Sequence, residues 1–136
     1  MARILVIDDQ NDVRAVICIV LQVNGFDVVE AATAAAGLKA FADGRFDAAV
    51  VDILLGDAIG YDVIAALRDR VPDLPIVVVS GLTSLDLDVQ RANLSKVVCL
   101  RKPFRTGELI RAIGTARAAA PTTRLASVGA RNRAGV

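Results

Sequence analysis

Four short, continuous runs of apolar residues in this chain each lead into a side chain that is charged or can donate a hydrogen bond. Residues 4–7, 48–51, 76–79 and 97–100 lead, in that order, into Asp8-Asp9, Asp52, Ser80 and Arg101-Lys102-Pro103. Continuous apolar strands are typical of a parallel sheet that is covered on both faces. Open α/β sheets carry their sites at the carboxyl ends of the strands. We therefore expect two aspartates, a lone carboxylate, a hydroxyl and an amine to meet at one edge.

Segments with the apolar spacing of helices separate these runs. The spacing predicts five helices, over 13–21, 33–44, 64–71, 82–92 and 106–116. Thr33 and Thr106 are expected to cap the second and fifth helices, and Gly25 is expected to end the first. Residues 26–30 mix charged and apolar side chains, as an edge strand does. The pattern therefore predicts five βα repeats, an α/β fold built on a five-stranded parallel sheet.

The composition limits the classes of protein to consider. The chain has 136 residues, 54% of them hydrophobic, which is enough for one domain with a buried core. No apolar stretch approaches the roughly 20 residues that span a bilayer, so we expect no membrane insertion. The basic residues are scattered, which disfavours direct nucleic-acid binding. Cys18 and Cys99 lack metal-ligand spacing, and we expect buried free thiols in a cytoplasmic protein.

The polar residues at the ends of the runs favour a single chemistry. Asp8, Asp9 and Asp52 would repel one another at one edge unless a cation lay between them. The chain has no histidine, so the site offers hard oxygen ligands, which suit Mg²⁺. Lys102 adds a positive charge and Ser80 a hydroxyl donor for a phosphoryl group. The combination indicates a site for Mg²⁺ and a phosphoryl group.

With these motifs the sequence resembles the receiver domains of bacterial two-component response regulators, over about residues 2–117. The matching segments are Ile4-Leu5-Val6-Ile7-Asp8-Asp9, Val51-Asp52-Ile53-Leu54-Leu55-Gly56-Asp57 with Gly60, Val77-Val78-Val79-Ser80-Gly81 and Lys102-Pro103-Phe104. The resemblance implies a flavodoxin-like, doubly wound fold with five helices and strand order 2-1-3-4-5.

The resemblance also implies a metal site and a phosphoacceptor. Asp52 would be the nucleophile that attacks a phosphohistidine on a sensor histidine kinase or a histidine phosphotransfer protein. Asp9, Asp52 and the backbone carbonyl of Leu54 would bind Mg²⁺ directly, and Asp8 would act mainly through bound water. These residues would hold the metal and accept the phosphoryl group.

Two further residues would bind the phosphoryl group once it arrives. Lys102 would neutralise a phosphoryl oxygen, and its bond to Pro103 would be cis. Ser80 and the neighbouring backbone N–H would donate hydrogen bonds to the same group. Positioning and charge neutralisation are most of what phosphoryl transfer requires of a protein.

The chain departs from the family pattern at several positions. Cys99 stands where the family usually has an aromatic residue, three positions before the lysine, that rotates when the hydroxyl residue moves. Gly56 replaces a common proline after the acceptor. Leu54 and Leu82, two positions beyond Asp52 and Ser80, are apolar where polar residues are frequent. These departures concern the switch and the rim of the site.

We therefore expect a stand-alone receiver domain over residues 1–119, followed by a disordered tail over 120–136. The domain would signal by phosphorylation-dependent binding to a downstream protein target. It would not be an enzyme with a separate substrate, because it would catalyse only its own phosphorylation and dephosphorylation.

Two alternatives remain open. The chain could be an interaction module that works without phosphorylation. It could also be a phosphohydrolase of the haloacid-dehalogenase type, whose nucleophile follows the first strand and needs a second acid two positions later. Here Gln10 occupies that position relative to Asp8, which disfavours the hydrolase. A flavodoxin-like nucleotide binder is disfavoured because no Gly-rich phosphate loop follows a strand.

Overall fold

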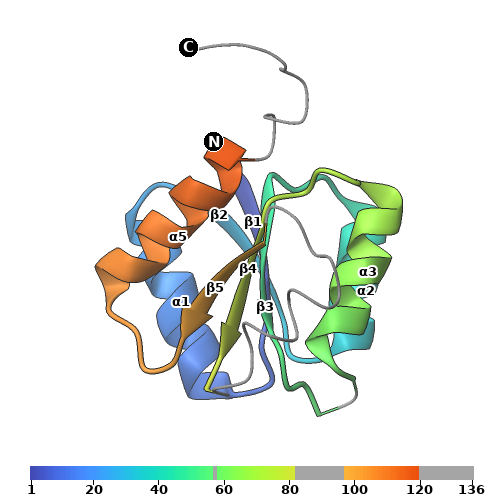
Figure 1. The fold of residues 1–136 in the computed structure, drawn as a ribbon, viewed down its shortest axis with the longest axis horizontal. Helices are drawn as coiled ribbons and strands as arrows, with labels where there is room; N and C mark the ends of the chain where they lie inside the picture. Colours follow the sequence, from blue (N-terminus) through green and yellow to red (C-terminus); the bar gives the residue numbers. More distant parts are fainter. Residues whose placement is uncertain (57, 82–96, 120–136) are drawn as a thin grey trace.

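The computed structural model describes residues 1–56, 58–81 and 97–119, which form a sheet between two layers of helices (Figure 1). The strands are β1 (Arg3–Ile7), β2 (Asp27–Ala31), β3 (Ala48–Asp52), β4 (Ile76–Ser80) and β5 (Val97–Arg101). The helices are α1 (Asn11–Val23), α2 (Ala34–Asp43), α3 (Gly60–Arg70) and α5 (Thr106–Ala119). The helix predicted over 82–92 and the tail predicted over 120–136 lie outside the described residues.

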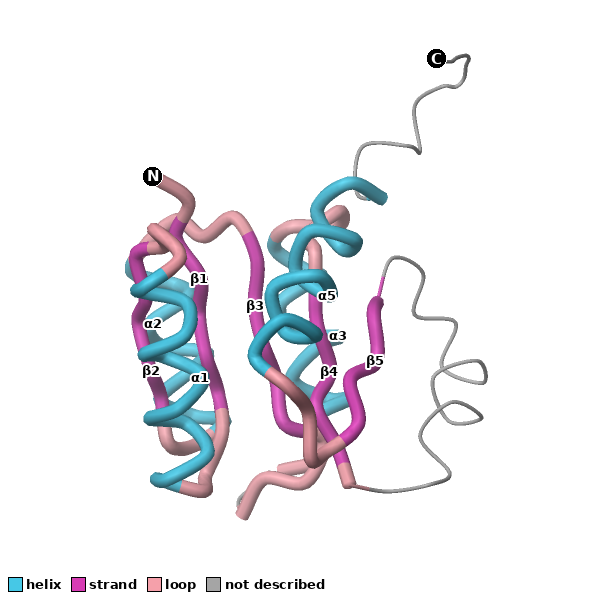
Figure 2. The backbone as a smooth tube through the Cα atoms, turned by 90° about the vertical axis from the view of Figure 1, so that its left-hand side faces the viewer, coloured by secondary structure: helices cyan, strands magenta, loops and turns pink. Residues whose placement is uncertain are grey.

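The five strands are parallel and pair in the order β2-β1-β3-β4-β5 (Figure 2). This confirms the predicted α/β architecture and strand order. In the register of the sheet, Asp52 at the end of β3 pairs with Val79 of β4, and Ser80 pairs with Arg101 of β5. The strands therefore end nearly level, and the residues at their carboxyl ends share one edge of the sheet.

The described helices cover the sheet on both faces and make two core layers. Figure 1 shows α2 and α3 on one face and α1 and α5 on the other. Successive residues of a strand point to opposite faces. In β1, Leu5 and Ile7 accordingly belong to the first layer, and Ile4 and Val6 to the second. β3 and β4 are buried along their whole length, which explains their uninterrupted apolar runs.

Two predicted helix ends are confirmed. Thr33 precedes α2, and its side-chain oxygen accepts the backbone N–H of Ala36 at 3.0 Å. Gly25 follows the end of α1 with a φ of 89°, a conformation that glycine adopts without steric cost. Thr33 bonds to a residue three positions away, and Gly25 acts through its own backbone conformation. The sequence alone therefore suffices to predict both helix ends.

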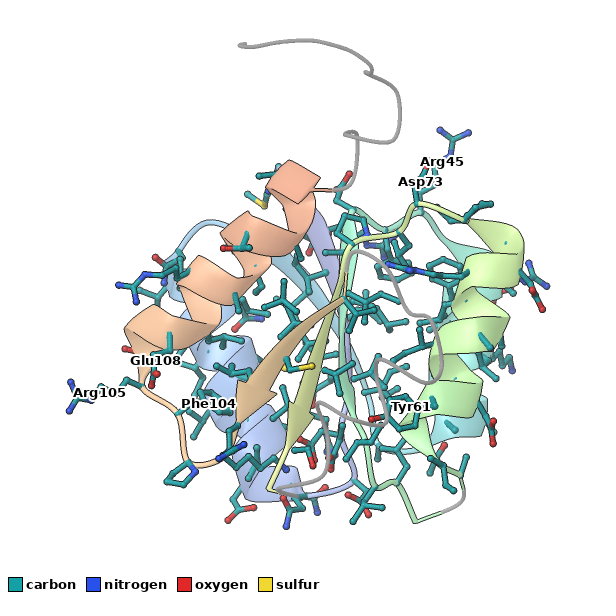
Figure 3. The ribbon with its side chains drawn as sticks, in the orientation of Figure 1. Arg45, Tyr61, Asp73, Phe104, Arg105 and Glu108 are labelled. Atoms are coloured by element: carbon teal, nitrogen blue, oxygen red, sulfur yellow. The ribbon has the colours of Figure 1, made fainter. Side chains whose placement is uncertain are left out.

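Two other predicted features of the helix ends are wrong. Thr106 is the first residue of α5 rather than its cap: Arg105 precedes the helix, and its backbone N–H donates to the Glu108 carboxylate at 2.7 Å (Figure 3). The carboxylate reaches back to the start of the helix, as in a capping box. α3 stops before Pro72, as predicted, but it ends at Arg70: Val71, which the spacing places in the helix, is driven out of helical conformation as the residue before proline, and it is exposed.

α3 begins in very close contact with the end of β3. The N–H of Gly60 donates to the carbonyl of Ile53 at 2.7 Å. A Cβ at Gly60 would lie 2.5 Å from the carbonyl oxygen of Asp52 and 2.8 Å from the Cα of Ile53. Only a residue without a side chain fits at this position, so Gly60 lets the loop after β3 fold back onto the strand that carries Asp52.

The expectation of two buried free thiols is met in part. Cys18 is buried and free, and burial is the main cause that raises the pKa of its thiol to about 11. Cys99 likewise forms no disulfide but is only half-buried, where it packs against the core layer of α2 and α3. Within the described ranges, no helix has the length and hydrophobicity needed to cross a membrane.

Candidate functional site

The three carboxylates predicted to form a metal site lie together at the carboxyl edge of the sheet. Asp8 and Asp9 follow β1, and Asp52 is the last residue of the neighbouring strand β3. One carboxylate oxygen of each lies within 4.8 Å of the other two. Asp8 is 1% exposed and Asp52 is 5% exposed, whereas Asp9 is open to solvent. The two buried carboxylates are held in place by the fold, and Asp9 lies at the solvent side.

Lys102 reaches this edge from the end of β5. Its Nζ lies 3.5 Å from Oδ2 of Asp52 and 3.6 Å from Oδ2 of Asp8. A shorter contact joins Nζ to the side-chain oxygen of Gln10, at 2.8 Å. The bond between Lys102 and Pro103 is cis, in agreement with the prediction. The backbone N–H of Lys102 donates to the carbonyl of Ser80 at 2.9 Å, which ties the β5 end to the β4 end.

Arg14 fixes the loop that carries the acid pair. Its Nη1 donates to the backbone carbonyl of Asp8 at 2.8 Å, and its Nη2 donates to Oδ1 of Asn11 at 2.9 Å. Its Nε lies 2.9 Å from Oε1 of Glu30 on β2. One guanidinium therefore joins β2, α1 and the end of β1, and it uses the planar fork of donors that lysine lacks.

A cavity of about 450 Å³ opens at this edge. Its lining consists of Asp9, Gln10, Asp52, Ile53, Leu54, Ser80, Gly81 and Lys102. Ser80 is the last residue of β4 and is 1% exposed. Leu54 is 53% exposed, and its backbone N–H donates to Oδ1 of Asp52 at 3.4 Å. The cavity thus joins two of the three predicted acids, Asp9 and Asp52, with the predicted hydroxyl and amine and with an apolar side chain at the rim.

The carboxyl of Asp52 has a shifted pKa. Burial is the largest cause that raises the pKa of its carboxyl from 3.8 to about 6, and the charge of Asp8 raises it further. Lys102 and the N–H of Leu54 act in the opposite direction. The rise means that the charges and donors around Asp52 only partly compensate for its burial.

The arrangement fits a Mg²⁺ ion in the chemistry of its donor atoms. Among the described residues, no donor lies within hydrogen-bonding distance of the buried Oδ2 of Asp8. The Lys102 ammonium lies 3.6 Å away, beyond hydrogen-bonding distance, and a buried charged oxygen that lacks a hydrogen bond is costly. A divalent cation held by Asp8, Asp9 and Asp52 would compensate this charge and relieve the repulsion among the three carboxylates.

Sequence reasoning missed two residues of the site. Gln10 contacts Lys102, and Arg14 holds the loop after β1. Both follow the acid pair closely in the sequence, but nothing local indicates that their side chains turn toward the site. Asp57 and Leu82 lie outside the described residues. Cys99 lies within β5 at the predicted position, and its role in a switch stays a prediction.

Comparisons with known proteins agree with this geometry. A family model described as "Response regulator receiver domain" matches residues 4–114. The transcriptional regulatory protein PrrA of Mycobacterium tuberculosis is 36% identical over 108 residues, which cover 79% of this chain and 46% of PrrA. The chain therefore spans about half the length of that relative.

Solved structures show the same fold. A response regulator receiver protein from Sinorhizobium medicae has a TM-score of 0.80 at 27% identity, covering 87% of this chain and 95% of that one. The response regulator TrrA from Thermotoga maritima, solved in complex with Mg²⁺-BeF, has a TM-score of 0.77 at 25% identity. That likeness covers 85% of this chain and 99% of TrrA.

Proposed function

Because the chain belongs to the response regulator receiver domain family, we propose that Asp52 accepts a phosphoryl group from a phosphohistidine. The donor would be a sensor histidine kinase or a histidine phosphotransfer protein. The observation that carries the proposal is the position of Asp52, which ends β3 at 5% exposure and lines one cavity with Ser80 and Lys102. Buried strand-end carboxylates need a chemical reason to be there.

In the proposed transfer, a carboxylate oxygen of Asp52 forms a bond to phosphorus. The bond from phosphorus to the donor's imidazole nitrogen breaks, and its electron pair leaves with that nitrogen. Asp52 attacks as the anion, and a pKa of about 6 leaves it mostly ionised at neutral pH. The Lys102 ammonium and the Ser80 hydroxyl stabilise the negative charge of the phosphoryl oxygens.

Mg²⁺, when bound, would supply positive charge that stabilises the phosphoryl oxygens. Asp9, Asp52 and the backbone carbonyl of Leu54 are the proposed direct ligands, and Asp8 acts mainly through bound water. Support comes from the clustering of the three carboxylates within 4.8 Å. Further support comes from TrrA, a relative in fold whose structure was solved with Mg²⁺-BeF.

A protein donor is supported by an apolar groove beside the site. This groove of about 420 Å³ is lined by Asp12, Val13, Val16, Lys102, Pro103 and Phe104. Lys102 lines both the groove and the phosphoacceptor cavity. Val16, Ile19 and Val23 of α1 are more than half exposed, so an apolar stripe continues from the groove. A donor that covers this surface would bring its phosphohistidine close to Asp52.

The output is proposed to be binding of a downstream protein target. PrrA is named as a transcriptional regulatory protein, but this chain matches only part of it. The scattered basic residues of this chain favour a protein target over direct nucleic-acid binding. The proposed domain acts on itself alone, by taking up and losing its own phosphoryl group.

Labelling with a small phosphodonor tests the proposal. We expect acetyl phosphate with Mg²⁺ to label Asp52, and we expect chelation of the metal or Asp52→Asn to abolish the label. Peptide mapping of the modified residue is the measurement. A label on Asp8 would instead favour the hydrolase, and a chain that takes no label from acetyl phosphate or from a phosphohistidine protein would favour the interaction module.

The Asp52→Asn variant needs a control for folding, and the raised pKa of Asp52 in the wild type supplies one. The pKa of the folded carboxyl, about 6, lies above the ordinary value of 3.8. Ionised Asp52 therefore weakens the folded state above pH 6, and this cost vanishes as the pH falls below 4. In metal-free buffer at neutral pH, Asp52→Asn is expected to be more stable than the wild type, by on the order of 1–3 kcal/mol. Urea unfolding measures the difference.

A further inference from the structure

The ammonium of Lys102 makes its shortest contact with a neutral side chain, although two buried carboxylates lie near it. Nζ is 2.8 Å from Oε1 of Gln10, but 3.5 Å from Oδ2 of Asp52 and 3.6 Å from Oδ2 of Asp8. Hydrogen bonds between an ammonium and a carboxylate are typically about 2.7–2.9 Å long. The ammonium therefore makes only a long hydrogen bond to Asp52 and a long ion pair with Asp8, and its close contact is with Gln10.

The backbone of Gln10 is fixed by hydrogen bonds on both sides. Its backbone N–H donates to Oδ1 of Asp8 at 2.9 Å, and its carbonyl accepts the N–H of Arg14 at 2.9 Å. Gln10 occupies the N-cap position of α1, where serine, threonine, asparagine or aspartate would bond to the helix. The structure gives Gln10 no such side-chain bond to α1. Its amide reaches instead to a lysine 92 positions away in the sequence.

We propose that Gln10 is a positioning residue, which holds the Lys102 ammonium at the mouth of the cavity and leaves room for a phosphoryl oxygen between Nζ and Asp52. The proposal rests on the proposed function of Asp52. An ammonium in full contact with the Asp52 carboxylate would occupy the space that this oxygen needs. One N–H of Lys102 is used by Gln10, and the other two remain for the site.

This placement would prepare the site before the phosphoryl group arrives. A lysine side chain has four rotatable bonds. Fixing its end in advance lowers the conformational entropy that this side chain must lose in the transfer step. When Asp52 takes up the phosphoryl group, Nζ can bond to the new oxygen without a large movement. In this role Gln10 acts through Lys102 and not on the phosphorus itself.

Two substitutions at position 10 distinguish the effect of the hydrogen-bond acceptor from the effect of side-chain length. Gln10→Met keeps the length but removes the acceptor, and Gln10→Glu keeps an acceptor. Gln22→Met is the matched control, because Gln22 is an exposed residue at the far end of α1. We expect Gln10→Met to slow labelling by acetyl phosphate on the order of three- to tenfold. Gln10→Glu should label faster than Gln10→Met, and Gln22→Met should match the wild type.

A double-mutant cycle tests whether the effect passes through Lys102. In a Lys102→Met background, Gln10→Met is expected to cause no further loss of labelling. An equal loss in both backgrounds, or wild-type labelling by Gln10→Met alone, would overturn the proposal.

The contact can also be measured without phosphorylation. The ¹H–¹⁵N resonance of the Lys102 ammonium should be visible in the wild type and should shift or broaden in Gln10→Met. An unchanged resonance would overturn the proposal, whatever the labelling result. If the wild type takes no label at Asp52 while the resonance responds to Gln10→Met, the contact stands and the proposed function fails. The two proposals therefore fail in distinguishable ways.

Discussion

At the scale of single residues, the cavity is polar at its base and apolar at one part of its rim. Asp52 and Ser80 are buried at strand ends, whereas Leu54 is 53% exposed two positions after Asp52. Hydrolysis of an aspartyl phosphate needs a water aligned opposite the leaving carboxylate. A leucine side chain cannot hydrogen-bond to that water, and it can shield the phosphoryl group from it. If Asp52 accepts a phosphoryl group as proposed, we expect this rim to favour a long-lived phosphorylated state.

The lifetime of the phosphorylated chain is the corresponding prediction. We expect slow loss of phosphate in the wild type and faster loss in Leu54→Asn, on the order of tenfold or more, because the amide can orient water. The decay of labelled protein after removal of the donor measures this. Leu82→Glu is predicted to act in the same direction, from its sequence position alone.

Ile59→Asn is the control for this prediction. Ile59 is 53% exposed, like Leu54, and the two residues form an isolated antiparallel bridge. Ile59 is not among the residues that line the cavity, so its substitution is expected to leave the decay rate unchanged. If neither leucine variant decays faster than the wild type, these leucines do not govern the lifetime.

At the scale of elements, the sequence predicts the features that depend on neighbours in the chain. The strand ends follow from the abrupt change from apolar to polar residues, and the Thr33 cap follows from a local bond. The prediction that Thr106 caps α5 is wrong because Thr106 and Glu108 can both bond to the backbone at the start of the helix, and propensity alone cannot rank them. The contact of Gln10 with Lys102 joins the end of β1 to the end of β5, and β3 and β4 lie between these strands in the sheet. No local sequence pattern indicates such a contact.

The junction between β3 and α3 gives a prediction on stability. Gly60→Ala places a Cβ 2.5 Å from the carbonyl oxygen of Asp52, so the backbone of one element must move. We expect a loss of about 1–3 kcal/mol in the free energy of unfolding. Labelling of Asp52 should also slow, because its strand end shifts. Urea denaturation and the labelling assay measure the two effects.

Gly114→Ala is the matched control in α5. A Cβ at Gly114 meets no atom within 4 Å, and the residue lies in a helix. This substitution is expected to raise stability by about 0.5–1 kcal/mol. A Gly60→Ala variant as stable as the wild type would contradict the tight junction.

At the scale of the whole molecule, two core layers on a fully parallel sheet account for the fold. Each layer is built from one set of alternating strand residues and two described helices. The apolar runs predict this architecture because a strand buried on both faces must be apolar throughout. The sequence also predicts that residues 120–136 take no part in the core, since their small, polar and basic composition offers no apolar face.

Truncation tests this last expectation. We expect a chain that ends at Ala119 to unfold at the same temperature as the full chain and to be labelled at the same rate. A fall of several degrees in the midpoint would correspond to about 1 kcal/mol for a domain of this size. Such a fall would mean that the segment after α5 packs on the domain.

The start of β1 and the end of α5 lie at the opposite end of the molecule from the edge where Asp52 ends β3 (Figure 1). A tether joined near either position would project away from the cavity. The domain could be immobilised on a sensor surface, or fused to a reporter at either end, with its pocket still facing the solution. Its geometry separates the point of attachment from the point of reaction, which is what a reusable component for an engineered phosphorylation circuit requires.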